Sequence, residues 1–541
     1  AFGNQTVSNA SYQDLLDVSG SASNSAVSVT GFTGLAASNS GTSTSNLSVG
    51  VSTGTAGSLA STVSLTLTSN ANGVSGLENG TAGVVGSPSA ITITGGVFSG
   101  NGVWNVAGSG TWGSGANANW TSTEGIAAAP GTFAGFGSTD SALFGSILSS
   151  GTATIALGSS NPSLAAVTFD NANGSYQLDG GSLTLNGGTG SALVTVSAGS
   201  HGISSGLALA TSSEFNVANS SVFTLSGIVS GVGGITKTGL GTLVINGANT
   251  YGGNTQINAG TLKIGNASAF GSSGAVSLAS GATLDLNSFV IGNAISNNGG
   301  TILNGTISGS VTANSGTTSI DTGLAAGSSL VVGSGATAIF GNGSFVSGSA
   351  SILNNGGLIV DRTTNALMQL AAPISGSGGL TVSGGVVDLS GVNDYTGLTQ
   401  VSNLGSLLKV NGSIAGDVQV GSGAMLGGSG AIAGVLSGAG IVSPGNSPGI
   451  LTASQFDPTL GLGAAFEFTA LNPVYGSPTA SLNDVLRLTG SSAFASNLTS
   501  SNAIDIYFNV DSIKMGDIFE GGFFTGLSAS NLLLAVQNAH F

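Results

Sequence analysis

The sequence predicts an all-β protein whose central part is a parallel β-helix, in which one strand-and-turn unit repeats and stacks. Short segments of alternating apolar and polar residues, each ended by Gly or Asn, recur from about residue 151 to 455. No long stretch shows the i, i+3, i+4, i+7 pattern of a capped helix. In addition, 94 of the 541 residues are Gly and only 5% are charged. This composition suits packed strands whose solvent face consists of hydroxyl and amide groups.

The repeated segments predict a long rod. Each coil needs roughly 20 residues, and parallel coils stack at about 4.8 Å, so residues 151–455 would form about 15 rungs and a rod of roughly 70 Å. Inward Val, Ile and Leu would form ladders, while outward Thr, Ser and Asn would face water. Clear examples of the repeated segments are Ser163–Asn171, Ser182–Gly188, Ser221–Gly227, Gly241–Gly247 and Ala282–Asn287.

Residues 1–100 predict an N-terminal β-sandwich. Asn46–Thr53, Ser61–Asn70 and Ser89–Phe98 alternate apolar and polar residues, as half-buried strands do. Turn-rich stretches of Ser, Asn and Gly separate them at a spacing typical of sandwiches. The segment Thr55–Leu77 resembles the Ig-like modules found near the start of bacterial exported repeat proteins.

Residues 101–150 form a junction that contains all three tryptophans, Trp104, Trp112 and Trp120. Two interpretations are open. The bulky rings could cap the exposed end of the stack, or they could form an aromatic strip that binds glycans. The first is favoured because polar partners for a sugar are not evident nearby.

The most specific pattern lies in residues 233–265. The residues that form this pattern are Gly233, Gly234, Lys237, Gly239, Gly241, Thr242, Leu243, Asn249, Tyr251, Gly260 and Leu262. This pattern resembles the autotransporter-associated β-strand repeat of bacterial exported surface proteins. A more degenerate second copy spans Gly378–Leu408; it lacks the Lys and has Asp394 where the first has Thr250.

This resemblance implies a right-handed parallel β-helix and an elongated passenger region. It also implies a secreted or cell-surface protein from which a signal peptide has been removed. Residues 456–541 have longer strand-like segments, which predict a C-terminal β-sandwich or cap. Pro444 and Pro448 cannot donate ladder hydrogen bonds, so we expect them to stop the stack before this region.

Composition argues against several functional classes. The formal net charge is -15 with only six Lys and Arg, so nucleic acid is an unfavourable partner. No apolar stretch approaches the ~18 residues of a membrane-spanning helix. We therefore expect neither a nucleic-acid partner nor a membrane-spanning segment in this chain.

Catalysis and cofactors are not predicted either. The basic residues are scattered, and the local pairs Asp361 with Arg362 and Asp484 with Arg487 are interpreted as ion pairs. His201 and His540 lack the spacing of a catalytic triad. We therefore predict no enzyme and no cofactor. Isolated Asp and Asn side chains with turn carbonyls could hold Ca²⁺, at a site that the sequence does not define.

The preferred hypothesis for function is a structural protein that self-assembles into a filament, sheath or surface layer. Few charges oppose lateral association between copies, and strands within residues 1–20 and 531–541 are expected to pair between them. The alternative is a monomeric adhesin that binds a polysaccharide through the Trp-rich junction. A carbohydrate-cleaving β-helix enzyme is the least favoured hypothesis.

Overall fold

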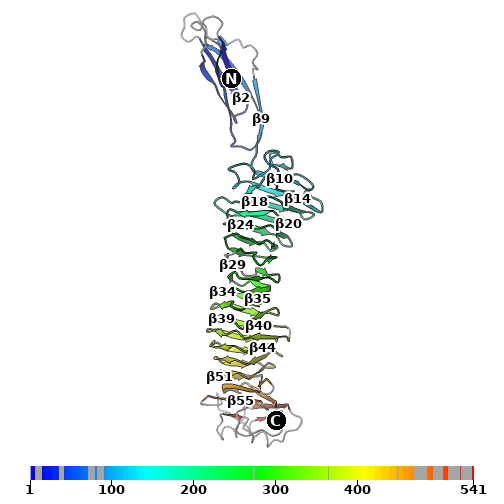
Figure 1. Ribbon diagram of the computed structural model, residues 1–541, viewed down its shortest axis with the longest axis vertical. Coiled ribbons are helices and arrows are strands. Elements are labelled where there is room, and N and C mark those ends of the chain that lie inside the picture. Colours follow the sequence, from blue (N-terminus) through cyan, green and yellow to red (C-terminus); the bar gives the residue numbers. More distant parts are fainter. Residues whose placement is uncertain are drawn as a thin grey trace.

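The computed structural model describes residues 2–5, 15–35, 42–70, 80–81, 90–271, 274–363, 365–446, 449–467, 484–490, 504–509, 524–525 and 539–540. Every regular element in these residues is a β-strand. An antiparallel module lies at one end, and a long stack of parallel coils follows it (Figure 1).

The N-terminal module contains only antiparallel pairs. Its small core is built on Val27, Leu59 and Val63 and is separate from the core of the rod. The predicted strand segments of this region coincide with three of its strands, β6, β7 and β9. The module consists of β1 (Phe2–Gln5) with β5 (Thr42–Ser45), β3 (Val27–Thr30) with β6 (Ser48–Val51), and the sheet of β4 (Phe32–Leu35), β2 (Leu15–Ala22), β7 (Gly57–Asn70), β8 (Gly80–Thr81) and β9 (Ala90–Val97).

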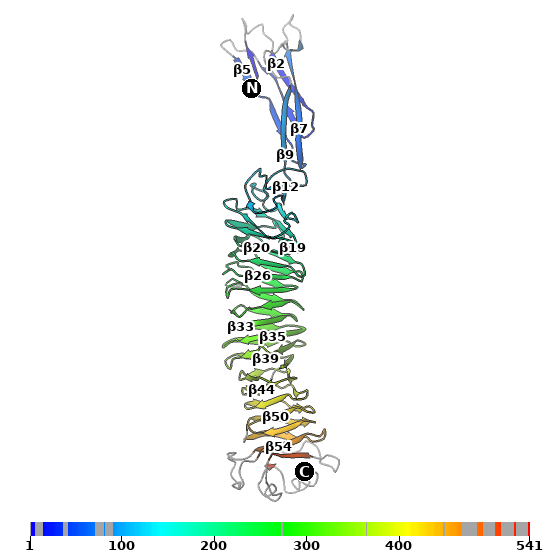
Figure 2. The ribbon, with the colours of Figure 1, turned by 90° about the vertical axis from the view of Figure 1, so that its right-hand side faces the viewer.

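The rod is a three-sided parallel solenoid of about 15 turns, and its coils stack along the length of the rod (Figure 2). The first face consists of β10 (Asn101–Trp104), β13 (Ser141–Phe144), β16 (Ala166–Asp170), β19 (Ala192–Ala198), β22 (Ser213–Val217), β25 (Ile235–Thr238), β27 (Thr255–Ile257), β29 (Val276–Leu278), β32 (Ile295–Asn297), β34 (Ser310–Ala313), β36 (Ser329–Val332), β39 (Ser351–Asn354) and β42 (Ile374–Ser375). It continues through β45 (Val392–Asn393), β48 (Ser413–Ile414), the first parts of β51 (Ala431–Gly438) and β53 (Ile450–Phe456), β55 (Val485–Leu488) and β57 (Phe524–Thr525).

The second face follows the first in each coil. It consists of β11 (Gly110–Thr111), β14 (Thr152–Ala156), β17 (Ser175–Asp179), β20 (Ser200–Ile203), β23 (Val222–Leu225), β26 (Thr242–Ile245), β28 (Thr261–Ile264), β30 (Thr283–Asp285), the first parts of β33 (Thr301–Ile307) and β35 (Thr317–Leu324), β37 (Thr337–Phe340), β40 (Gly357–Val360), β43 (Gly379–Val382), β46 (Thr399–Val401) and β49 (Val418–Val420).

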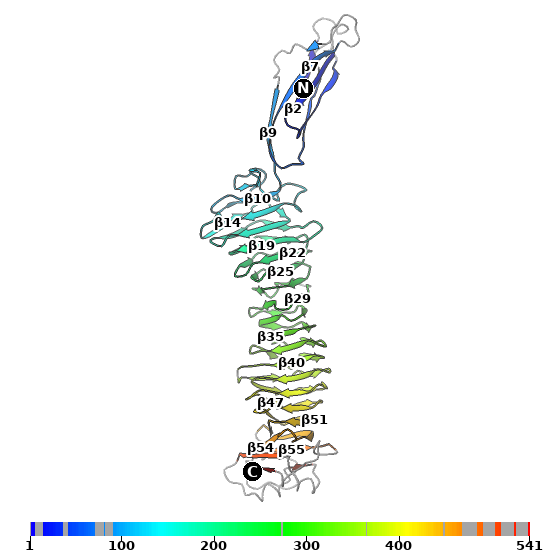
Figure 3. The ribbon, with the colours of Figure 1, turned by 180° about the vertical axis from the view of Figure 1, so that it is seen from behind.

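The third face begins with short strands and becomes regular toward the C-terminal part of the rod. Figure 3 shows from behind how the coils stack along the rod. It consists of β15 (Ser163–Leu164), β18 (Ser182–Leu185), β21 (Gly206–Leu209), β24 (Val229–Gly231), β31 (Val290–Ile291), the second parts of β33 and β35, β38 (Phe345–Val346), β41 (Leu367–Leu370), β44 (Val386–Leu389), β47 (Leu407–Val410), β50 (Met425–Gly428), β52 (Ile441–Pro444), β54 (Gly463–Glu467), β56 (Ile504–Asn509) and β58 (Ala539–His540).

Inward ladders of apolar side chains form the core, as the alternating pattern predicts. On the second face, Leu243, Leu262 and Leu284 lie in register on successive coils and are fully buried. Their outward neighbours Thr242 and Thr261 are partly exposed. The same ladder runs through Phe223, Leu243, Leu262, Leu284, Ile302, Ile320, Phe340, Val360, Val382, Val401 and Val420.

The stack does not stop at Pro444, contrary to the sequence-based expectation. Pro444 is the last residue of β52, in register with Gly428 of β50. The adjacent Gly445 and Gly428 exchange two backbone hydrogen bonds of 2.8 and 3.0 Å, and β53 continues the stack. Pro448 lies outside the described residues.

The strands described after residue 456 all pair in parallel with earlier coils. They form none of the antiparallel pairs that a separate sandwich over residues 456–541 would show. At both ends of the chain, the strands that the structure describes pair within the chain: β1 with β5, β2 with β7, and β58 with β56. The remaining residues of 1–20 and 531–541 lie outside the described part.

Candidate functional site

The most unusual residue of the predicted repeat is Lys237, because it points into the core. In β25 it lies in register between Phe215 and Ile257, and it is fully buried. Its Nζ donates to the backbone carbonyl oxygens of Thr238 (2.7 Å), Gly239 (2.7 Å) and Ala259 (3.2 Å). An ammonium has three donors, so all of them are paired. Burial lowers the pKa of Lys237 to about 8.

The residues that lie in register with Lys237 on later coils indicate its structural role. The same inward position is Asn297 and Asn354 on later coils, where the chain turns from the first face to the second. Asn297 accepts from the amide of Gly300 and donates to its carbonyl, and Asn354 donates to the carbonyl of Gly379. Polar side chains in this column therefore form hydrogen bonds with backbone groups at the corner or on the following strand.

Asn249 and Tyr251 connect successive coils at another corner. The Asn249 side chain accepts from the amide of Val229 (2.8 Å) and donates to the carbonyl of Ala269 (2.7 Å). It thus joins the coil before it to the coil after it. The buried Tyr251 hydroxyl lies 2.6 Å from the hydroxyl of Thr255, and burial raises its pKa to about 12.

The degenerate second copy reproduces this corner. Asn393 accepts from the amide of Ile374 (3.0 Å) and donates to the carbonyl of Ser413 (2.9 Å). The Tyr395 hydroxyl lies 2.6 Å from the Thr399 hydroxyl. However, Asn249 lies next to a strand of the third face and Asn393 lies on the first. The repeat therefore encodes one coil rather than one particular face.

The second copy also shows what replaces the lysine. Val382 stands at the position of Lys237 and is fully buried. The carbonyl of Ser383, which corresponds to that of Thr238, accepts instead from the Asn403 side chain at 2.6 Å. One corner carbonyl thus receives a donor in both copies, from inside the coil in the first and from outside in the second.

The glycines of the repeat serve the corners. Gly239 (φ 72°) directly follows β25, and Gly260 (φ 66°) directly precedes β28. Both adopt the left-handed backbone conformation that glycine tolerates. Side chains at Gly233, Gly234 and Gly241 would collide with backbone atoms of adjacent coils. These positions keep the coils close enough for ladder hydrogen bonds.

The three tryptophans are buried in the first coils of the rod. Each is at most 1% exposed, and the ring centroids of Trp112 and Trp120 lie 4.5 Å apart. Trp104 packs edge-on against Trp120 at 5.2 Å. The indole N–H of Trp120 donates to the Trp112 carbonyl, and that of Trp112 to the Pro130 carbonyl. None of the three rings is free to stack on a sugar, so the arrangement favours a packing role.

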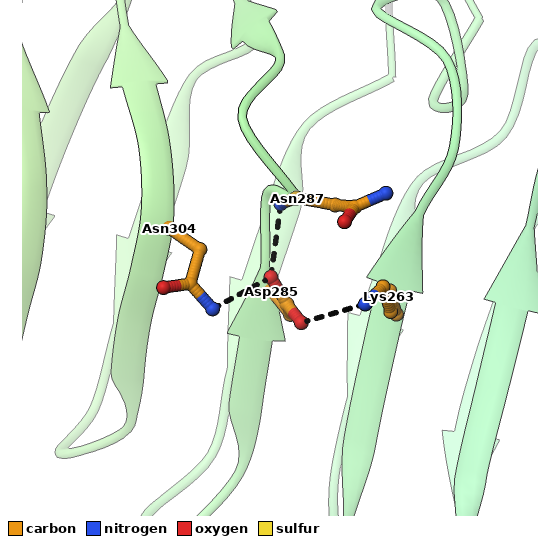
Figure 4. Close-up of polar contacts among 4 residues, drawn as sticks. All are labelled: Lys263, Asp285, Asn287 and Asn304. Atoms are coloured by element: carbon orange, nitrogen blue, oxygen red, sulfur yellow. Dashed lines mark hydrogen bonds and ion pairs between the residues drawn. The ribbon is translucent and has the colours of Figure 1, made fainter.

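Charged side chains follow two patterns. On the outside of the second face, Lys263 lies 3.5 Å from Asp285, which also accepts from the Asn287 amide and the Asn304 side chain (Figure 4). Arg362, by contrast, does not pair with Asp361 as the sequence suggested. Its guanidinium points inward, because Arg362 follows the inward Val360 by two residues in an alternating pattern. It donates to the carbonyls of Asn342 and Ser344 at 3.0 Å.

His201 lies in the inward ladder of the second face, in register with Phe223 and stacked on Phe169 and Tyr176. Its Nδ1 accepts from the Tyr176 amide at 3.0 Å, and its Nε2 lies 2.8 Å from the Ala198 carbonyl oxygen. These partners require the neutral tautomer that carries its proton on Nε2. Burial lowers the pKa of His201, and protonation would remove the acceptor for Tyr176.

We expect His201 to make the first coils of the rod sensitive to acid. Since the pKa is lowered in the folded state, the unfolded chain binds more protons below about pH 6.5, and stability falls as the pH decreases through this region. His201→Gln supplies a neutral acceptor and should flatten this dependence. Thermal melts between pH 7.5 and 4.5, read by circular dichroism, test it.

His201→Phe is the matched control. It keeps a ring in the ladder but gives the Tyr176 amide no acceptor, so it should lower the melting temperature at every pH without restoring the acid dependence. If wild type and both variants lose stability in parallel on acidification, His201 is not the titrating group.

Among the residues that the structure describes, no three His, Asp or Glu side chains gather as metal ligands would. No helix in the described residues is long and apolar enough to cross a bilayer.

A family model of the passenger-associated-transport-repeat matches residues 235–264. The match contains Lys237, Asn249, Tyr251 and Gly260, whose side chains and backbone build the corners described above. Comparison with curated proteins and comparison with solved structures each gave no match.

Fold and repeat together define the class of this protein: it is a parallel β-solenoid that contains one passenger-associated-transport-repeat. The match over residues 235–264 is consistent with a passenger-type repeat protein of autotransporters.

Proposed function

We propose that this chain is the structural shaft of an exported bacterial surface protein, and that copies associate into a filament, sheath or surface layer. In this proposal the coil is right-handed, the N-terminal antiparallel module is Ig-like, and the strands β55 to β58 are the last rungs of the stack and close the rod. The rod holds its shape through inward ladders, and its length carries the N-terminal module away from the opposite end.

One observation carries the proposal: a continuous stack of parallel coils contains a repeat associated with passenger transport. Each coil buries the edge of its neighbour, so rigidity extends over the whole rod. With 27 charged residues among 541, counted from six basic and 21 acidic ones, the rods repel each other little. The buried tryptophans give no support to a glycan-binding strip at the junction.

Electron microscopy of the purified protein over a series of concentrations tests the assembly. We expect single straight rods at low concentration and ordered bundles, fibres or sheets as the concentration rises. Dispersed rods at every concentration would contradict assembly.

Gold-labelled antibodies against the rod, applied to intact and to permeabilised cells, test export separately. Labelling of intact cells supports a surface location. Labelling that requires permeabilisation would reject export whatever the purified rods do.

A further inference from the structure

The third face carries an outward column of apolar side chains. The pairing register places one of them on each of five successive coils. Leu367 is 49% exposed and Met425 is 39% exposed, and the others are partly exposed. We call this column the apolar stripe; it consists of Leu367, Val386, Leu407, Met425 and Ile441.

The stripe differs from an outward column of the second face. The corresponding outward column of the second face is a run of threonines on four successive coils, Thr242, Thr261, Thr283 and Thr301. An outward hydroxyl column needs no partner, because water satisfies it. An outward aliphatic column leaves apolar area in water that contact with another apolar surface would remove.

A charged column runs beside the stripe on the same strands. Asp388 and Lys409 are neighbours in it on adjacent coils, with Gln369 before them and Gly427 after them. Asp388 accepts from the Asn411 side chain at 2.8 Å. Lys409 makes no ion pair within the part of the chain that the structure describes. The charged column thus places one negative and one positive group a single coil apart.

We propose that the apolar stripe is the contact surface for a second copy of this chain, packed face to face with its rod antiparallel to the first. The inference rests on the self-association proposed above. A two-fold axis parallel to the strands, between the coils of Val386 and Leu407, generates this arrangement. Val386 then faces Leu407 of the second copy, and Leu367 faces Met425.

Charge complementarity selects the antiparallel arrangement. The same axis places Asp388 opposite Lys409 of the second copy, and Lys409 opposite its Asp388. Parallel rods related by an axis along their length would carry the two charged columns to opposite flanks of the contact, where they could not meet. Only the antiparallel rods gain two ion pairs at the edge of an apolar contact.

The size of the stripe sets the expected affinity. Five coils at about 4.8 Å span about 20–25 Å, so the contact is well below the ~800 Å² per partner of a standard interface. We therefore expect a weak dimer, visible at high concentration and strengthened where many copies are held side by side.

Charge reversal tests the orientation by sedimentation equilibrium. Asp388→Lys and Lys409→Asp should each weaken association about tenfold or more, because each places like charges opposite one another twice. The double variant should restore association to near the wild-type value. Val386→Glu should also abolish it, while the matched outward substitution Thr283→Glu on the second face should leave it unchanged.

Cross-linking provides an independent readout, because the chain contains no Cys. A mixture of Leu367→Cys chains and Met425→Cys chains should form a cross-linked dimer. Neither variant alone should, because in the antiparallel dimer the two copies of either residue lie three coils, about 14 Å, apart along the rod. Cross-linking of Leu367→Cys with itself would overturn the antiparallel arrangement.

Two other outcomes separate the two proposals. If wild type associates and the stripe and charge variants associate equally well, the apolar stripe is not the contact surface, although self-assembly stands. If wild type stays monomeric at every concentration, both self-assembly and the stripe contact are rejected. Melting curves of every variant, expected to match wild type, exclude misfolding as the cause.

Discussion

Leu262→Ala is expected to lower the free energy of unfolding by about 3 kcal/mol, the typical cost of truncating a fully buried Leu. Leu262 is completely buried between Leu243 and Leu284 in the ladder of the second face. The lost methyl groups leave a cavity that parallel coils, fixed by ladder hydrogen bonds on three faces, cannot close. Guanidinium unfolding followed by circular dichroism measures the loss.

Thr261→Ala is the matched control, since Thr261 is on the same strand and points outward. Its effect should stay within about 0.5 kcal/mol. Hydrogen exchange adds a spatial test, because each coil interacts with its nearest neighbours. Amides of β26, β28 and β30 should lose protection in Leu262→Ala, while those of β47 and β50 should not. Equal destabilisation by the two substitutions would refute the inward ladder.

The different orientations of Leu262 and Thr261 could be predicted from the sequence. Alternation along Thr261-Leu262-Lys263-Ile264 assigns Leu262 to the core and Thr261 to solvent, because successive residues of a strand point to opposite sides. The same rule located strands in the N-terminal module, such as the segment Ser61–Asn70 within β7. Short strands between glycines, repeated through the chain, were sufficient to predict a stack of coils.

The inward orientation of Lys237 and Arg362 was not predicted, because their charge was given more weight than their place in the alternation of inward and outward residues. Lys237 follows Ile235 by two residues, and Arg362 follows Val360 by two, so the period-2 pattern places both inside. A charge in such a position needs partners, and the corner carbonyls supply them. The phase was thus visible in the sequence, but the carbonyls belong to other coils and appear only in the fold.

Other features depend on register, which one sequence does not determine. In Leu407-Leu408 two identical residues are adjacent, so one must point outward, and only the pairing of β47 with β44 and β50 shows that it is Leu407. Likewise, a run of tryptophans is compatible with a cap or a binding strip. The burial of Trp104, Trp112 and Trp120 depends on antiparallel pairing of β10 with β12 (Trp120–Thr121) and on the coils that follow.

Lys237→Met should destabilise the rod by about 2 kcal/mol. Two effects compete. Met removes the cost of burying an ammonium, and replacing a buried ionic group by an apolar one is often neutral. Here, however, the partners are backbone carbonyls that cannot be removed, and those of Thr238, Gly239 and Ala259 all lose a donor. Guanidinium unfolding measures the balance. The matched control is Lys263→Met, which removes only the exposed pair with Asp285 and should cost well under 1 kcal/mol.

The pH dependence of this difference identifies the charge as its source. The pKa of Lys237 falls from 10.5 to about 8 in the folded protein, so the unfolded state binds more protons between these values. Wild-type stability therefore rises with pH from about 8 toward 10.5, and this rise should be missing in Lys237→Met. The stability difference between Lys237→Met and wild type should consequently widen between pH 7 and pH 10.

Above pH 10, Tyr251 and Tyr395 lower the stability of both proteins. Burial raises their pKa to about 12, so the unfolded chain ionises first and stability falls as the pH rises. A deficit that narrows between pH 7 and pH 10 would mean that the three carbonyls hold the ammonium more strongly than burial opposes it.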